Sequence, residues 1–166
     1  MTGTVVIGLG NPILGDDAVG LHVARALEAN LAGIKGVVIK ELHAGGMRVM
    51  DALAGFERAV IVDAMCTGAL APGSVRRLEV GQLGQARNLA STHDTNLPTA
   101  LELGRMLGLR MPSTVSIYGI EALEVETFGE TLSEDVRRSV PEAVRLIARE
   151  LRADTSPNLW NGALRL

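Results

Sequence analysis

Near its start the chain reads TVVIGLGNPILGDDAVG over residues 4–20. Residues 4–9 form a short β-branched run that ends in glycines, which is typical of a strand buried on both faces of a sheet. From Asp16 to Leu31 apolar residues recur close to the helical period. A buried strand, a glycine-rich turn and an amphipathic helix predict the first half of a parallel strand-helix-strand unit.

The rest of the chain repeats this alternation. The pattern predicts strands at 37–42, 58–63 and 113–120 and helices at 47–53, 96–107 and 133–151. Turn residues precede 74–80, which we expect to pair back as an antiparallel edge strand. Residues 81–95 have no clear period and are interpreted as a long connection. Pro141 lies inside the last helix, which either kinks there or restarts with Ser139 and Glu142 as a capping box.

These elements predict an α/β fold with a single three-layer domain. We expect a twisted, mostly parallel sheet of about five strands, with one antiparallel edge strand and helices on both faces. The chain has 166 residues, of which 47% are hydrophobic, enough for one sizeable core. We assign residues 1–154 to this domain and residues 155–166 to a C-terminal tail.

Composition excludes several classes of function. The net charge is −3 and only 2% of residues are aromatic, so nucleic-acid binding is disfavoured. No apolar segment reaches the roughly 18 to 20 residues of a membrane span, so membrane insertion is not expected. The start of the chain has no signal-peptide pattern and the only cysteine is Cys66, which favours a cytoplasmic protein.

Acidic residues follow two of the predicted strands, where ligands of open α/β sheets bind. Asp63 ends an apolar run, and a carboxylate there needs a cation or hydrogen-bond donors. Asp16 and Asp17 open the first helix, and because one cap needs one acid, we expect Asp16 to cap it and Asp17 to face the cleft. A purely structural role for either Asp63 or Asp17 is the competing interpretation.

His93 ends the long connection, just before a helix that would fix its position. Together with Asp17 and Asp63 it would give two carboxylates and one imidazole, a set that suits a divalent ion. No zinc-binding spacing is present. Cys66 is interpreted as a small buried residue without an activating partner. The glycines at 8 and 10 lack the third glycine of a dinucleotide-binding fingerprint.

Four segments of the chain resemble the endopeptidases that mature the large subunit of nickel-iron hydrogenases. They are GLGNPILGDDAVG (8–20), HAGGM (43–47), VIVDA (60–64) and STHD (91–94). The resemblance implies removal of a C-terminal extension from the large-subunit precursor after nickel insertion. The family's metal-contacting positions fall on Asp17, Asp63 and His93, which are therefore the expected catalytic and metal-binding residues.

The resemblance further implies that nickel is supplied by the precursor and is not permanently bound. The segment that follows the second strand would receive the extended substrate; it comprises His43, Ala44, Gly45 and Gly46. A structural loop is expected from Gly8, Gly10, Asn11 and Asp16. Many relatives have glutamate where this chain has Asp17, so the ligand arm is one methylene shorter here.

Two other functions compete with the protease. The same acids could serve a nickel-checking chaperone that binds the precursor and cuts nothing. GLGNP (8–12) also looks like the opening of peptidyl-tRNA hydrolase, but acids occupy the positions after it and the acidic chain suits RNA poorly. Within the protease itself, the metal could activate water or only dock the substrate, and in the second case Asp17 or Asp63 would act as general base.

Overall fold

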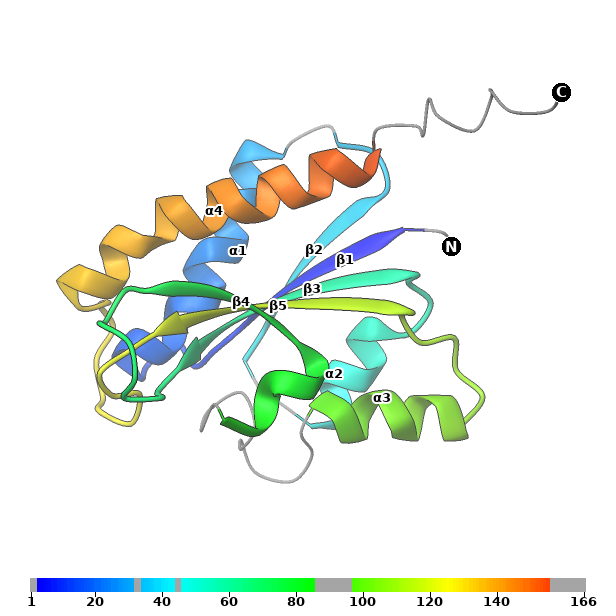
Figure 1. The fold of residues 1–166 in the computed structure, drawn as a ribbon, viewed down its shortest axis with the longest axis horizontal. Helices are drawn as coiled ribbons and strands as arrows, with labels where there is room; N and C mark the ends of the chain where they lie inside the picture. Colours follow the sequence, from blue (N-terminus) through cyan, green and yellow to red (C-terminus); the bar gives the residue numbers. More distant parts are fainter. Residues whose placement is uncertain (1–2, 32–33, 44–45, 86–96, 156–166) are drawn as a thin grey trace, which may run out of the picture.

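The computed structural model describes residues 3–31, 34–43, 46–85 and 97–155 (Figure 1). The strands are β1 (Thr4–Leu9), β2 (Val37–Leu42), β3 (Arg58–Met65), β4 (Val75–Glu79) and β5 (Thr114–Glu121). The α-helices are α1 (Val19–Asn30), α2 (Met47–Leu53), α3 (Leu97–Met106) and α4 (Glu134–Thr155). Two short 3-10 helices, η1 (Gly15–Ala18) and η2 (Val80–Gln85), precede α1 and follow β4. No helix among these residues is long and apolar enough to cross a membrane.

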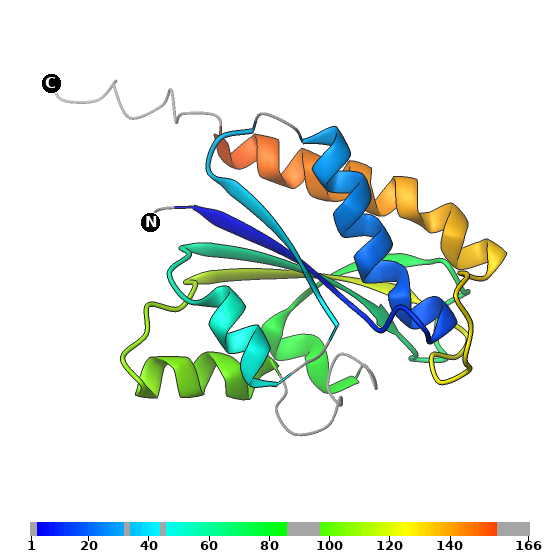
Figure 2. The same cartoon turned by 180° about the vertical axis from the view of Figure 1, so that it is seen from behind.

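The strands form one sheet in the order β2-β1-β3-β5-β4. All neighbouring pairs are parallel except β4 with β5, which is antiparallel and places β4 at the edge. Helices α1 and α4 cover one face, and α2 and α3 cover the other (Figures 1 and 2). The predicted fold class is therefore confirmed, including the antiparallel edge strand. The proposed boundary between domain and tail stays a prediction, because residues 156–166 lie outside the described part.

Alternating strand residues fill the two cores. Val6, Val60 and Val62 face α1 and α4, whereas Val5, Ile7 and Ile61 face α2 and α3. All six are buried, as expected for strands that are covered on both faces. The carboxyl ends of the parallel strands meet at one edge of the sheet, which is called the carboxyl edge below.

Two glycines bring the start of α1 against the strands without any side chain between them. A Cβ atom on Gly8 would lie 2.2 Å from the carbonyl oxygen of Gly20. A Cβ atom on Gly20 would lie 2.2 Å from the Leu9 oxygen and 2.4 Å from the Val62 oxygen. Backbone therefore packs directly on backbone here, and the turn that contains Asp17 is fixed to β1 and β3.

Helix α4 continues through Pro141 without a break, which decides between the two alternatives left open by the sequence. The hydroxyl of Ser139 donates to the Val136 carbonyl within the helix and does not cap a new one. The apolar side chains before and after the proline lie in the same core, so packing holds the helix together across the missing backbone N–H. Part of the expected long connection is also helical, because η2 covers residues 80–85.

A single carboxylate joins α4 to three strands. Glu150 accepts hydrogen bonds from Arg58 at 2.8 Å, Arg77 at 2.9 Å, Ser116 at 2.6 Å and Tyr118 at 2.5 Å. Burial alone would raise the pKa of Glu150, but the hydrogen bonds from Arg77, Ser116 and Tyr118 outweigh it and hold this pKa below its ordinary value. The network is a structural clamp on the α1 and α4 face of the sheet.

Candidate active site

Two acids that the sequence singled out lie together at the carboxyl edge. Asp63 belongs to the last part of β3, where it is in register with Gly119 of β5. Asp17 belongs to η1, the turn that follows β1 and packs against β3. Their charges influence each other, since the negative charge of Asp17 contributes to the raised pKa of Asp63. The structure therefore brings Asp17 and Asp63 together, as the strand-end argument predicts.

Asp63 is held in an unfavourable environment for a negative charge. Burial raises the pKa of its carboxyl well above the ordinary value, and the nearby Asp17 raises it further. The backbone N–H of Ala64, which donates to Oδ1 at 2.8 Å, offsets only part of this rise. Two carboxylates with too few donors are a strong attractor for a cation, because a cation removes both the repulsion and the cost of burial.

Asp17 is positioned by the glycine-rich loop before it. The backbone N–H of Asn11 donates to Asp17 Oδ2 at 2.7 Å, which lowers the pKa of Asp17, but burial raises it by more. The Asn11 side chain in turn accepts from the Ile13 N–H at 3.2 Å and shapes the loop. Gly10 adopts φ +153°, and a Cβ atom there would lie 2.1 Å from the Asp17 carbonyl oxygen. Gly10 and Asn11 thus shape the loop that precedes Asp17.

The prediction that Asp16 caps the first helix is wrong. No side chain caps η1 or α1. The Asp16 carboxylate instead accepts the backbone N–H of Ser133 at 2.6 Å and the Ser133 hydroxyl at 2.8 Å, directly before α4 begins. Asp16 is thus a buried structural residue that links the first turn to the last helix, and Asp17 alone of the two acids faces Asp63.

A third acid at this edge, Glu121, was not among the predicted site residues. It ends β5, has only 1% of its surface exposed, and accepts the N–H of Thr67 at 2.8 Å, the Thr67 hydroxyl at 2.8 Å and the N–H of Gly68 at 2.9 Å. These bonds fix the loop that follows β3. The signal was present in the sequence, because Glu121 ends an apolar strand just as Asp63 does.

Cys66 lies near the same edge and is only partly buried, not fully buried as the sequence interpretation has it. Its thiol donates to the Ala122 carbonyl at 3.3 Å. Burial raises the pKa of this thiol, and the neighbouring acids, Glu121 first, raise it further. The thiol therefore stays protonated, which is the opposite of what a nucleophilic cysteine requires.

The expected substrate segment is described only in part. His43 follows β2 with an exposed side chain, and its Nε2 lies 3.8 Å from a Glu41 carboxylate oxygen. Gly46 adopts φ +72° and precedes α2, a backbone conformation that favours glycine. Ala44, Gly45 and His93 lie outside the described residues. Their roles, and that of His43, stay predictions.

Among the described residues no group of three His, Cys, Asp or Glu side chains is arranged to hold a metal ion. The expected set has three members, and only Asp17 and Asp63 belong to the described part of the chain. Two carboxylates supply hard oxygen ligands, and one imidazole would complete a set that is suitable for a divalent transition metal. The two described acids supply oxygen ligands whose chemistry fits a divalent cation.

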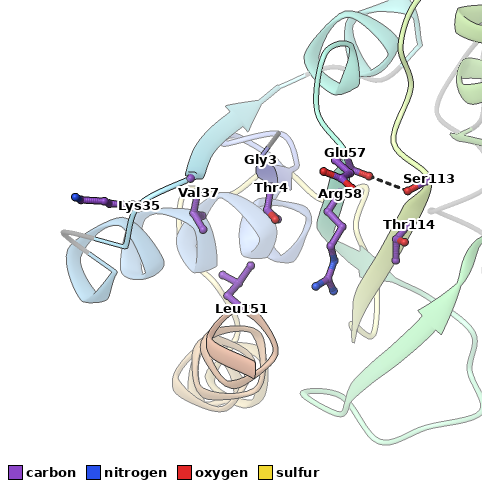
Figure 3. A pocket seen from close by; sticks show the side chains of 10 residues that line it. Gly3, Thr4, Lys35, Val37, Glu57, Arg58, Ser113, Thr114 and Leu151 are labelled. Carbon is purple, nitrogen blue, oxygen red and sulfur yellow. Dashed lines mark hydrogen bonds between the residues drawn. The ribbon is translucent and has the colours of Figure 1, made fainter. Parts of the chain in front are cut away.

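Two hollows lie at the opposite edge of the sheet. The first, of about 330 Å³, is lined among others by Thr4, Lys35, Arg58 and Leu151 (Figure 3). The second, of about 630 Å³, lies between β4 and α3. Neither contains Asp17 or Asp63, and Arg58 in the first is already paired with Glu150. The paired acids, and not these hollows, are the best candidate for a chemical site.

Comparison with known proteins gives a consistent result. Residues 21–150 match the family model HycI, described as hydrogenase maturation protease. The hydrogenase 2 maturation protease of Escherichia coli (strain K12) is 28% identical over 158 residues, covering 88% of this chain and 96% of the relative. The hydrogenase expression/formation protein HupD of Thiocapsa roseopersicina is 24% identical over 144 residues, covering 86% of this chain. The match spans 64% of that HupD relative, which is less than two thirds of its length.

The fold has a solved counterpart. The hydrogenase maturating endopeptidase HybD from Escherichia coli superimposes with a TM-score of 0.76, covering 92% of this chain and 94% of that structure. The two sequences are 22% identical, so this likeness concerns the fold. It agrees with the sheet order and helix layers described above.

Proposed function

Since the chain belongs to the hydrogenase maturation protease family, we propose that it is an endopeptidase that removes the C-terminal extension of a nickel-iron hydrogenase large-subunit precursor after nickel insertion. The observation that carries this proposal is the pair of carboxylates, Asp17 and Asp63, at the carboxyl edge. The family match also favours a protease over the peptidyl-tRNA hydrolase alternative. We place the reaction in the cytoplasm.

In this proposal nickel is part of the substrate. Asp17, Asp63 and His93 hold the nickel of a loaded precursor, which aligns the scissile peptide with the carboxyl edge. The raised pKa values of Asp17 and Asp63 support a site that favours a cation, because both carboxyls are partly buried and the charge of Asp17 also acts on Asp63. A precursor without nickel gains none of this stabilisation, and it is therefore not processed.

Hydrolysis adds water to the scissile carbonyl carbon, breaks the C–N bond and transfers a proton to the leaving amine. We assign the proton transfer to a carboxylate oxygen of Asp17 or Asp63 that does not contact the nickel, which takes a proton from the attacking water and passes it to the leaving amine. The extended substrate lies along His43 and residues 44–46, which follow β2 at the same edge of the sheet.

The test uses the hydrogenase large-subunit precursor from the same host, with and without nickel, and measures its intact mass after incubation. Loss of a short C-terminal peptide from the nickel-loaded form alone is the expected result. Asp17→Asn and Asp63→Asn should reduce the rate at least about a hundredfold, as expected for groups that take part in proton transfer. Asp51→Asn, an exposed acid on α2, is the matched control and should cleave like the wild type.

Other outcomes separate the alternatives. If the loaded precursor binds and neither form is cleaved, the chain is a nickel-checking chaperone. If neither form binds, the partner is wrong. Cleavage at the wild-type rate by both aspartate variants would overturn the site assignment while leaving the protease activity in place.

A further inference from the structure

Three large apolar side chains are exposed near the paired acids. Ile13 is 49% exposed, Leu123 82% and Phe128 79%. We call these three residues the apolar rim. The other phenylalanine, Phe56, and the tyrosine, Tyr118, are both buried. The chain has few aromatic residues, and an exposed phenylalanine near a candidate site indicates a contact with another protein.

The backbone places the members of the apolar rim on one region of the surface. Leu14 and Gly129 form an isolated parallel bridge between the loop after β1 and the loop after β5. The Gly15 N–H donates to the Gly129 carbonyl at 2.7 Å, and the Gly129 N–H donates to the Ile13 carbonyl at 3.0 Å. Ile13 and Phe128 are therefore on adjoining, hydrogen-bonded segments. Leu123 follows Ala122, whose N–H donates to the Met65 carbonyl at 2.8 Å.

The loop that carries Leu123 and Phe128 is internally braced. The Glu124 carboxylate accepts the N–H of Glu126 at 2.9 Å and the N–H of Thr127 at 2.6 Å, and it also accepts the Thr127 hydroxyl. Val125, between the two exposed residues, is buried in the core. Phe128 is thus presented to solvent by an ordered loop, which lowers the entropic cost of binding a partner.

The loop that carries Ile13 also positions one of the paired acids. Ile13 belongs to the same loop as Asn11, whose N–H binds Asp17. Both views of the fold show the loop at residues 122–132, drawn in yellow, beside the start of the first helical segment, drawn in blue (Figures 1 and 2). A large substrate that delivers a peptide to Asp17 and Asp63 must lie against this part of the surface.

Charge indicates what kind of surface fits there. Residues 121–135 contain six acids and no lysine or arginine. Glu126 and Glu130, on either side of Phe128, are exposed. A partner surface with an apolar centre bordered by Lys and Arg side chains would complement these residues in both hydrophobicity and charge.

We propose that the apolar rim and the acidic residues Glu126 and Glu130 form the surface that docks the folded body of the hydrogenase precursor, through a face of that precursor that is apolar at its centre and basic at its border. This inference rests on the proposed function and adds a second recognition element to it. The paired acids recognise the nickel, and the apolar rim binds the protein that carries it.

The test compares two double variants in cleavage of the nickel-loaded precursor, with KM and kcat measured separately. Leu123→Ala/Phe128→Ala should raise KM about tenfold or more and leave kcat within about twofold, because these residues act in docking. Met106→Ala/Leu107→Ala is the matched control. Met106, which is 78% exposed, ends α3, and Leu107, which is 59% exposed, follows it at the opposite edge of the sheet. The control variant should therefore leave KM unchanged.

A charge variant tests the second half of the proposal. Glu126→Gln/Glu130→Gln should weaken precursor binding and make KM less sensitive to added salt than in the wild type. Equal thermal unfolding of all variants verifies that the fold is intact, as expected for exposed positions.

The outcomes distinguish this inference from the proposed function. If the wild type does not cleave the loaded precursor, the proposed function fails and the docking surface fails with it. If the wild type cleaves and Leu123→Ala/Phe128→Ala has the same KM, only the docking surface is wrong. If both double variants raise KM equally, the contact is a general apolar effect and the assigned location is wrong.

Discussion

Asp63 shows at the scale of one residue how a candidate catalytic group can lower the stability of the fold. Its carboxyl is partly buried beside Asp17 and receives a hydrogen bond only from the Ala64 N–H among the described residues. Its raised pKa means that the folded protein holds the proton more tightly than the unfolded chain does. The free energy of unfolding therefore falls as the pH rises from the ordinary value of 3.8 towards the raised pKa.

Asp63→Asn should consequently stabilise the protein at neutral pH while it abolishes cleavage. The amide carries no charge, so both the burial cost and the repulsion with Asp17 disappear. We therefore expect the free energy of unfolding of Asp63→Asn to exceed that of the wild type at neutral pH. Urea unfolding at pH 7.5 and at pH 4 measures it, and the gain should shrink at the lower pH. Equal loss of stability at both pH values would show that Asp63 is structurally satisfied.

At the scale of elements, one glycine in β1 and one in α1 let these elements pack closely and set the position of Asp17. Backbone contact at Gly8 and Gly20 leaves no room for a side chain, and neither segment can move away without disturbing β3. The turn with Asp17 is thus placed by packing that lies beneath it. Such support from rigid elements is what holds a chemical group in a fixed geometry.

Gly8→Ala tests this packing. The new methyl group would lie 2.2 Å from the Gly20 oxygen and 2.7 Å from the Ala24 Cβ atom. We expect a loss of about 3 kcal/mol or more in the free energy of unfolding, because backbone must shift to accept it. Gly81→Ala is the control, since a Cβ atom there meets nothing within 4 Å. Urea unfolding of both variants makes the comparison, and equal stabilities would contradict the proposed contact.

Prediction from sequence succeeded where the pattern is local. Strands β1 and β2 and helix α2 have the predicted bounds, because their apolar periodicity and flanking glycines act within a few residues. It failed where a partner is distant in the chain. Asp16 follows a glycine at a helix start, yet its partner Ser133 lies 117 residues further along. Pro141 shows the same limit, because core packing on both sides of it outweighs its local effect.

The candidate site was predictable to a similar extent. The strand-end rule and the resemblance singled out Asp17 and Asp63, which the structure brings together. The same rule applied to the end of β5 would have found Glu121, but a loop-bracing acid and a ligand look alike in sequence. The role of His93 stays a prediction.

At the scale of the whole molecule, Glu150 connects α4 with the sheet. Its carboxylate accepts bonds from β3, β4 and β5, and its side chain is largely buried. Hydrogen bonds hold the pKa of Glu150 below its ordinary value of 4.5. The stability that Glu150 contributes is therefore fully present at a pH above 4.5 and is lost as the pH falls through the pKa of the folded protein.

Glu150→Gln should therefore remove a pH-dependent part of the stability. At neutral pH we expect a loss of about 3 to 5 kcal/mol, because the two arginines lose a buried partner. Below pH 4 the difference from the wild type should narrow, which thermal unfolding across a pH series measures. Tyr118→Phe, which removes one donor and keeps the charge pairs, is the milder control and should cost about 1 kcal/mol. A constant difference at every pH would rule out the charged clamp.

The adjacency of Asp16 and Asp17 has a consequence for how this protein can evolve. The proposed function predicts different selection on the two neighbouring codons, since Asp16 binds Ser133 before α4 and Asp17 faces Asp63. Substitution at position 16 is limited to residues whose side chains can still accept the hydrogen bonds of Ser133 at the start of α4. Under the proposed function, substitution at position 17 is limited to metal ligands of the right charge, even where another residue would be more stable. A shift of the turn by one residue would remove Asp16 from Ser133 and Asp17 from Asp63. We therefore expect insertions and deletions to be rarer here than substitutions.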